Sequence, residues 1–163
     1  MNKLVSGLLC FVLLIAATSA NAVTNLLTNY SQLVKALERG DDVKAIIRLD
    51  FCDITDPELQ SQLAQNIDAA TTRINFTQYL HFKTRINEQL RDIVTTSTEQ
   101  LIENTPGVFL QMIARLNVLD DNTATLRVNF YNHNLSTGYL VVDFECDISN
   151  GKDENGLLLY DSP

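Results

Sequence analysis

Two aspartates and two histidines are the residues of this chain whose chemistry could serve a reaction. Asp50 and Asp53 lie three positions apart, and paired carboxylates can act as general acid and general base. His81 alternates with apolar neighbours, as a residue on a sheet face does, and His133 lies in a predicted turn. The sequence contains no Gly-x-Ser-x-Gly, His-Glu-x-x-His or Cys-x-x-Cys motif and no phosphate-binding glycine loop. No common class of active site is therefore indicated.

An oxygen-rich segment, residues 147–156, is the candidate for binding a cation. Calcium loops alternate their carboxylates before a fixed glycine and close with a glutamate at the twelfth position. Reading back from Gly156 puts Gly151 at the first ligand position, and no glutamate stands at the twelfth. We therefore expect a turn between strands here. Because two histidines also make a histidine-rich site improbable, we predict no metal and no cofactor.

The N-terminus has the three parts of a secretory signal peptide, predicted over residues 1–22. Lys3 supplies a positive charge, the next 15 residues are almost wholly apolar, and small residues permit cleavage between Ala22 and Val23. The alternative is a membrane anchor, which needs about 20 apolar residues. A lipid on Cys10 is disfavoured because leucine precedes it and the apolar run continues past it. We expect Cys10 to be removed with the signal peptide.

Cleavage leaves residues 23–163, enough for one domain with a sizeable core. Removing Lys3 changes the formal net charge from −8 to −9, because one positive charge is lost. An acidic protein is a poor general partner for nucleic acid or for an anionic membrane surface. No second apolar run is long enough to span a bilayer. The sequence therefore predicts an exported protein, periplasmic or secreted, with no stable membrane anchor after cleavage.

Two helices and a strand are predicted in the N-terminal half. Helical spacing over residues 29–40 predicts a helix that is capped by Asn29 or Ser31 and ends at Gly40. A strand follows over residues 43–52, and Asp56 caps a short second helix that opens with proline. Simple alternation puts Cys52 on the face opposite the apolar residues of its strand. The strand must therefore twist or end before this cysteine, or both of its faces must be partly covered.

The C-terminal half is predicted to be mostly β, and a hairpin is its clearest part. Residues 108–119 and 123–132 alternate between apolar and polar side chains, with three residues between them. Such a loop pairs Val118 with Ala124, and each apolar residue of one strand then meets an apolar residue of the other. Asn122 can take the left-handed conformation that these loops commonly require.

The same register places Arg115 opposite Arg127, a like-charge pair that is destabilising unless an anion lies nearby. The next predicted strand, residues 139–148, carries Asp143, which faces Arg127 if this strand continues the meander. We therefore predict a structural charge cluster of Arg115, Arg127 and Asp143 on a solvated sheet face. The alternative is that the two arginines bind an anionic ligand.

Cys52 and Cys146 are the two cysteines that remain once the signal peptide is removed. In an oxidising compartment the simplest expectation is a disulfide between them, which would join the first predicted strand to the last. If both were free thiols, they would instead be candidates for reactive groups.

Taken together, these features resemble the VirK family of small exported bacterial proteins. The similarity extends over most of the mature chain, where residues 30–40, 43–52, 115–122 and 144–146 carry it, and the signal peptide fits the family as well. These are packing and disulfide features. They therefore carry over no catalytic residue. What the resemblance itself implies is the family's association with bacterial virulence.

The predicted fold class is α+β: a mainly antiparallel β-sheet with the N-terminal helices packed on it and one disulfide. Residues 23–163 would form a single VirK-like domain. The first functional hypothesis is an exported, virulence-associated binding or accessory protein without catalysis, whose partner is an unknown protein or envelope component. The second is a periplasmic hydrolase of unfamiliar type that uses carboxylates such as Asp50 and Asp53.

Overall fold

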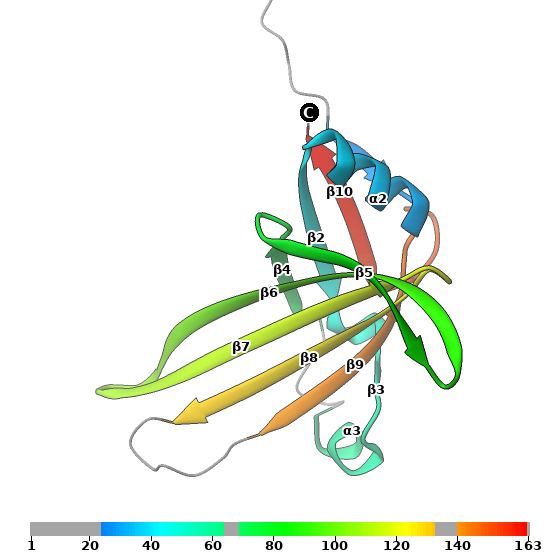
Figure 1. Cartoon of the computed structure of the whole chain (residues 1–163). Coiled ribbons are helices and arrows are strands. Elements are labelled where there is room, and N and C mark those ends of the chain that lie inside the picture. Colours follow the sequence, from blue (N-terminus) through cyan, green and yellow to red (C-terminus); the bar gives the residue numbers. More distant parts are fainter. Residues whose placement is uncertain (1–23, 64–68, 133–139, 163) are drawn as a thin grey trace, which may run out of the picture.

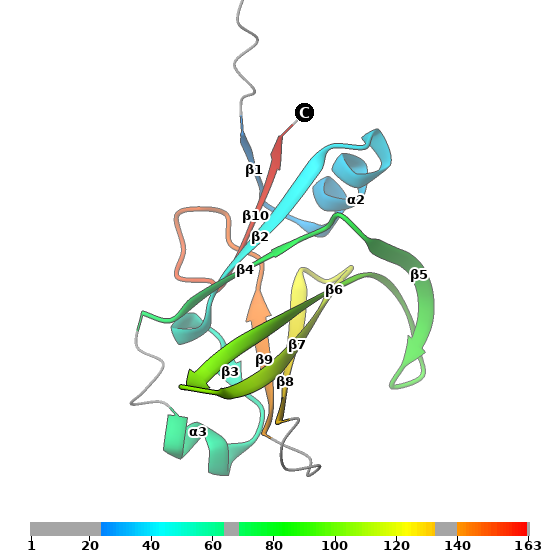
Figure 2. The ribbon, with the colours of Figure 1, turned by 90° about the vertical axis from the view of Figure 1, so that its left-hand side faces the viewer.

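The structure, a computed structural model, describes residues 24–63, 69–132 and 140–162. The predicted signal peptide, its cleavage site between Ala22 and Val23, and His133 lie outside these residues. The described residues form two antiparallel β-sheets and two α-helices (Figures 1 and 2). The predicted α+β class, with mainly antiparallel strands and one disulfide, is confirmed. The strands divide into two sheets, however, where we expected one twisted sheet.

The smaller sheet brings the first and last strands of the described chain side by side. Its order is β1-β10-β2-β4, and each neighbouring pair is antiparallel. The residue pattern of its central strands alternates between buried and half-buried side chains, as a sheet covered on one face requires. The strands are β1 (Asn25–Leu27), β10 (Leu157–Ser162), β2 (Asp42–Arg48) and β4 (Thr71–Asn75).

The larger sheet is a meander of long strands with one short strand at its edge. Its order is β3-β9-β8-β7-β6-β5. The strands are β3 (Asp53–Ile54), β9 (Val141–Asp147), β8 (Thr123–Asn132), β7 (Val108–Leu119), β6 (Gln89–Thr105) and β5 (Tyr79–Ile86).

The hairpin between β7 and β8 has the predicted register. Val118 pairs with Ala124, and Asn122 adopts the predicted left-handed conformation with φ of 70°. Asn122 also has a role that its sequence position did not reveal, because its Oδ1 accepts a hydrogen bond from the backbone N–H of Tyr30 at 2.8 Å. The turn is therefore joined to the first residue of helix α2 (Tyr30–Arg39).

Helix α2 begins and ends where the sequence predicted. The side chain of Asn29 accepts a hydrogen bond from the N–H of Gln32, and Gly40 takes the left-handed conformation with φ of 82°. The second helix, α3 (Pro57–Leu63), is capped by Asp56, whose Oδ1 accepts from the N–H of Glu58 at 2.9 Å. α2 buries four residues, whereas α3 has none that is fully buried and lies at the opposite end of the molecule (Figure 1).

One hydrophobic core connects α2 with both sheets. The larger sheet turns the even-numbered residues of β7, β8 and β9 toward this core, because successive side chains of a strand point to opposite faces. The odd-numbered residues of the same strands form what we call the outer face. The core residues of these three strands are Ala114, Leu116, Val118, Ala124, Leu126, Val128, Val142, Phe144 and Cys146.

The strand predicted over residues 43–52 ends earlier than expected. β2 stops at Arg48, and a single 3-10 turn over Leu49–Phe51 leads into β3 of the other sheet. Cys52 therefore does not belong to the alternation of β2. Alternation had placed Cys52 on the face opposite the apolar residues, and one of the predicted explanations was that the strand ends before this cysteine. The structure shows that arrangement.

Candidate functional site

The disulfide between Cys52 and Cys146 continues the pairing of β3 with β9. The two Sγ atoms lie 2.06 Å apart and the two Cα atoms 4.6 Å apart. Asp53 pairs with Glu145 and Ile54 with Phe144, so the two cysteines occupy the next position of the same antiparallel register. The bond therefore joins a crossing between the sheets to β9. It does not join the first strand to the last, as we had predicted, because β10 follows β9.

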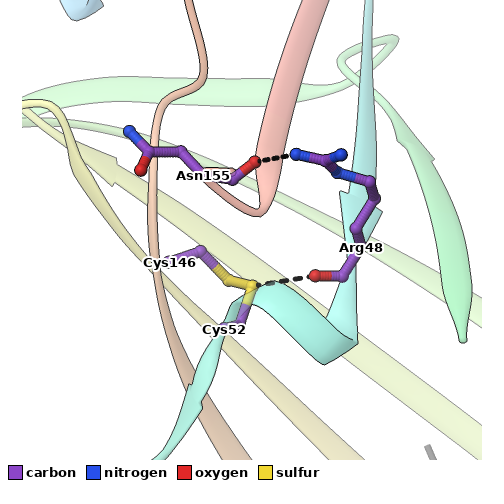
Figure 3. The surroundings of a disulfide bond; sticks show 4 residues. All are labelled: Arg48, Cys52, Cys146 and Asn155. Carbon is purple, nitrogen blue, oxygen red and sulfur yellow. Dashed lines mark hydrogen bonds between the residues drawn. A yellow bond between two sulfur atoms is a disulfide. The ribbon is translucent and has the colours of Figure 1, made fainter. Parts of the chain in front are cut away.

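Two segments carry the chain from one sheet to the other next to this disulfide (Figure 3). One is the turn from β2 to β3, and the other is the connection from β9 to β10. Arg48 is the last residue of β2, and its Nη2 donates a hydrogen bond to the carbonyl oxygen of Asn155 at 2.6 Å. Its backbone N–H donates to the carbonyl oxygen of Gly156 at 2.8 Å. The Sγ of Cys52 lies 3.4 Å from the carbonyl oxygen of Arg48. Because an oxidised sulfur carries no proton, this is a close contact without a donated hydrogen.

The β5–β6 hairpin curls over the outer face of the larger sheet (Figures 1 and 2). Ile86, close to the tip of this hairpin, lines the same hollow as Thr125 of β8 and Glu145 of β9. Ile93 and Leu119 are buried beneath it, although neither belongs to the main core. The curl therefore turns a flat sheet face into a concave one.

The first hollow on the outer face has a volume of about 420 Å³ and one strongly acidic wall. Asp53 and Glu145 are directly opposite each other on β3 and β9, and like charges in that position are destabilising. The sequence alone did not reveal this pair. Once the two cysteines are known to be bridged across antiparallel strands, however, their neighbours Asp53 and Glu145 must also face each other. The other charged lining residues are Arg91, Asp121 and Asp147.

The second hollow, of about 540 Å³, lies beside the first and is more apolar. Tyr79, Leu80 and Phe82 of β5 line it, and the exposed fraction of Leu80 is 66%. The two hollows share Asn117, whose Oδ1 accepts from the Thr95 hydroxyl at 2.7 Å. We call the two hollows together the trough.

Arg91 closes one end of the trough through ion pairs. Its Nε lies 2.6 Å from Oδ1 of Asp120, and its Nη2 lies 2.5 Å from Oδ2 of Asp121. The hydrogen bonds that Arg91 donates to these two carboxylates raise the pKa of Arg91, and the guanidinium in turn lowers the pKa of Asp120. Burial acts to raise the pKa of Asp121, but hydrogen bonds from Arg91 and Thr123 outweigh it and leave that pKa below its ordinary value.

Arg115, Arg127 and Asp143 lie on the outer face in the register that the sequence predicted. Arg127 donates two hydrogen bonds to Asp143, at 2.7 and 2.9 Å, and this carboxylate raises the pKa of Arg127. Arg115 lines the second hollow. Within the described ranges, no carboxylate lies at ion-pair distance from Arg115. Asp143 therefore neutralises Arg127, whereas Arg115 keeps its charge and faces the trough.

The remaining chemical candidates do not gather at the trough. Asp53 lines the first hollow, but Asp50 lies exposed in the 3-10 turn and is not part of that lining. His81 forms a 2.8 Å hydrogen bond with Asp92, and neither residue lines either hollow. The carboxylate pair on which the hydrolase hypothesis depended thus does not share one hollow.

Residues 148–156 form the connection from β9 to β10, so the turn between strands that the sequence predicted is present, although Asp147 still belongs to β9. Asp153 organises this turn, because it accepts hydrogen bonds from the Ser149 hydroxyl at 2.7 Å and from the N–H of Asn150 at 3.1 Å. These bonds lower the pKa of Asp153. In the part of the chain that the structure describes, no group of three histidine, cysteine or acidic side chains is arranged to hold a metal ion.

Comparison with known proteins identifies the family. A family model described as VirK protein matches residues 26–135, which is more than half of the chain. The chain belongs to the VirK family. The crystal structure of a VirK family protein from Legionella pneumophila superimposes with a TM-score of 0.60 and 14% sequence identity, covering 82% of this chain and 97% of that one. At this identity the likeness concerns the fold. No protein with a curated description matches the chain.

Proposed function

We propose that this VirK family protein is an exported, virulence-associated binding or accessory protein that acts without catalysis of its own. The trough is its binding surface. The observation that carries the proposal is the group of apolar side chains that β5 exposes along a concave sheet face. Contiguous exposed apolar surface on a soluble protein commonly marks an interaction site.

The apolar side of the trough can supply binding energy. Leu80 and Phe82 lie on the concave side of the curled hairpin with exposed fractions of 66% and 42%. Covering apolar surface yields about 25 cal/mol per Å² removed from water. The polar residues between the two hollows, including Asn117, are already hydrogen-bonded to one another and would orient a partner without being left unpaired.

The acidic side of the trough favours a partner that carries positive charge. Asp53 and Glu145 repel each other across the β3–β9 pair, and Asp147 lies in the same hollow. A cationic group placed between them would relieve this repulsion. The partner is thus a protein or envelope component that presents apolar groups beside basic ones.

Export is part of the same proposal. It is supported by the predicted signal peptide and by the disulfide, since such bonds persist in oxidising compartments. Among the described residues, no helix is both long and apolar enough to cross a membrane. Fractionation of growing bacteria tests this part: recovery of the processed, oxidised chain outside the cytoplasm is expected, and recovery of an unprocessed cytoplasmic chain would contradict it.

Photocrosslinking in living bacteria during infection-like growth tests the binding surface. A photoreactive phenylalanine derivative at position 82 should give discrete adducts. The matched control is position 51, because Phe51 is 40% exposed, nearly as much as Phe82, but lies outside the trough. Glu145→Lys should abolish the Phe82 adducts. Equal adducts at both positions, or none at position 82, would refute the proposal.

A further inference from the structure

β6 has a long edge that is not paired. This 17-residue strand pairs with β7 over Ile93–Thr105, but with β5 only over Gln89–Thr96. In the described ranges, no strand pairs with the other edge of residues 97–105. Figure 1 shows β6 and β7 projecting from the body as an arm. One side of the arm therefore presents backbone N–H and C=O groups as a template for a further strand.

This edge lacks the devices that protect the other sheet edges. β3 and β1 are only two and three residues long, β4 carries Arg73, and β5 carries Lys83 and Arg85. Residues 97–105 contain no lysine, arginine or proline. The arm also exposes Leu101, at 64%, on one face and Ile102 on the other. An edge of this kind pairs readily with an added strand.

We propose that the edge of β6 from Ser97 to Glu103 receives an extended segment of a partner protein as an additional antiparallel strand. The charged residues of this edge are Glu99 and Glu103, which lie on the same face because they are four positions apart. The incoming strand carries basic side chains opposite them. Its backbone forms hydrogen bonds with β6, and the charge pairs set its register.

The same two glutamates disfavour a second copy of this chain as the occupant. A symmetric antiparallel pair centred on Glu99 would set this residue opposite its own copy. A pair centred on Leu101 would set each Glu99 opposite Glu103 of the other copy, and one centred on Gln100 would place the glutamates diagonally. Each register brings like charges together, whereas a basic strand removes the repulsion.

The base of the edge opens onto a polar hollow of about 380 Å³ between β6 and β4. Ser97, Thr98 and Gln100 line it from β6, and Arg73 and Asn75 from β4. Arg73 disfavours a basic residue at this end of the incoming strand. The edge thus selects a strand that is neutral opposite Ser97 and basic opposite Glu99 and Glu103.

This inference goes beyond the proposed function, because the β6 edge overlaps the trough at a single residue, Ser97, and either surface can fail alone. The test uses the full mature chain and a fluorescent peptide, acetyl-Lys-Val-Leu-Thr-Lys-Thr-Thr-amide, whose two lysines match the spacing of the glutamates. Anisotropy should show binding that its counterpart with both lysines replaced by glutamate lacks. Equal binding of the two peptides, or no binding of either, would overturn the proposal.

Two methylated forms of the basic peptide separate strand addition from simple charge attraction. Alternate N–H groups of an antiparallel strand face the same neighbour, so methylation of one alternate set blocks pairing with β6 and methylation of the other set does not. One methylated peptide should bind and the other should not. Equal binding of both would show attraction by charge alone and would overturn the proposal.

Matched charge reversals locate the site on the protein. Glu99→Lys should weaken binding of the basic peptide about fivefold, as expected for loss of a cross-strand charge pair. Glu38→Lys, on the exposed side of α2, changes the net charge equally and should leave binding unchanged. Equal weakening by both variants, or sedimentation of the free protein as a dimer that Glu99→Lys disrupts, would overturn the proposal.

Discussion

Reduction of the Cys52–Cys146 disulfide should strongly destabilise the fold while leaving its structure in place. The bond joins residues 94 positions apart. In the chain-entropy model, closing a loop of this length stabilises the folded state by about 4.7 kcal/mol, because the constraint acts mainly on the unfolded chain. A domain of this size has a net stability of roughly 5–15 kcal/mol. Loss of the bond should therefore remove at least about 30% of the net free energy of unfolding.

Urea unfolding of the oxidised and the reduced protein, followed by circular dichroism, measures this difference. With an m-value of about 2 kcal/mol per M, the unfolding midpoint should fall by about 2 M on reduction. The same free energy corresponds to a decrease in Tm of about 15 °C for a chain of 141 residues, the 163 of the sequence less the 22 of the predicted signal peptide.

A double variant, Cys52→Ala with Cys146→Ala, provides the control for the reductant. It should unfold near the reduced protein and should not respond to reductant, and its far-UV spectrum below the transition should match that of the oxidised form. If the oxidised and reduced proteins unfolded within about 1 kcal/mol of each other, the assigned stabilising role of the long loop would be wrong.

Three further experiments, with four substitutions, test other parts of the structure. Gly156→Ala should destabilise the fold by about 1–3 kcal/mol in urea, because its Cβ would lie 2.9 Å from the Phe51 carbonyl oxygen and closer still to a disulfide sulfur; an unchanged midpoint would contradict this. Arg127→Ala and Asp143→Ala should each cost under about 1 kcal/mol and show coupling in a double-mutant cycle, since the pair is exposed; loss with only the arginine variant would refute the pairing. Because the pKa of Asp153 is lower in the folded than in the unfolded state, its contribution is present above about pH 4 and is lost as the pH falls further; thermal melts of Asp153→Asn should show a weaker acid dependence than wild type, and identical pH profiles would argue against this role.

Local features of the fold could be predicted from the sequence. The β7–β8 register follows from alternation on both sides of a three-residue loop, and it placed Arg115 opposite Arg127 in advance. The ends of α2 at Asn29 and Gly40 follow from cap chemistry within one turn. These predictions succeed because each depends on residues close in sequence or on the strict period of a strand.

Features that depend on distant residues could not be predicted. The division into two sheets follows from the 3-10 turn after Arg48, which alternation alone does not reveal. β10 lies between β1 and β2 and pairs with both, and no local sequence pattern predicts which strands become its neighbours. The trough depends on the curl of the β5–β6 hairpin, which brings Ile86 over residues of β8 and β9. Alternation assigns side chains to the two faces of a strand but does not determine how strongly a sheet bends.

The disulfide also divides the chain into a covalent ring and two tails. The ring runs from Cys52 to Cys146 and includes β4 together with the larger sheet up to the bridged residue of β9. The tails carry β1, α2 and β2 at one end and β10 at the other, and they pair with each other in the smaller sheet. A single proteolytic cut inside the ring therefore releases no fragment. A nicked molecule would migrate as one species without reductant and as two pieces with it.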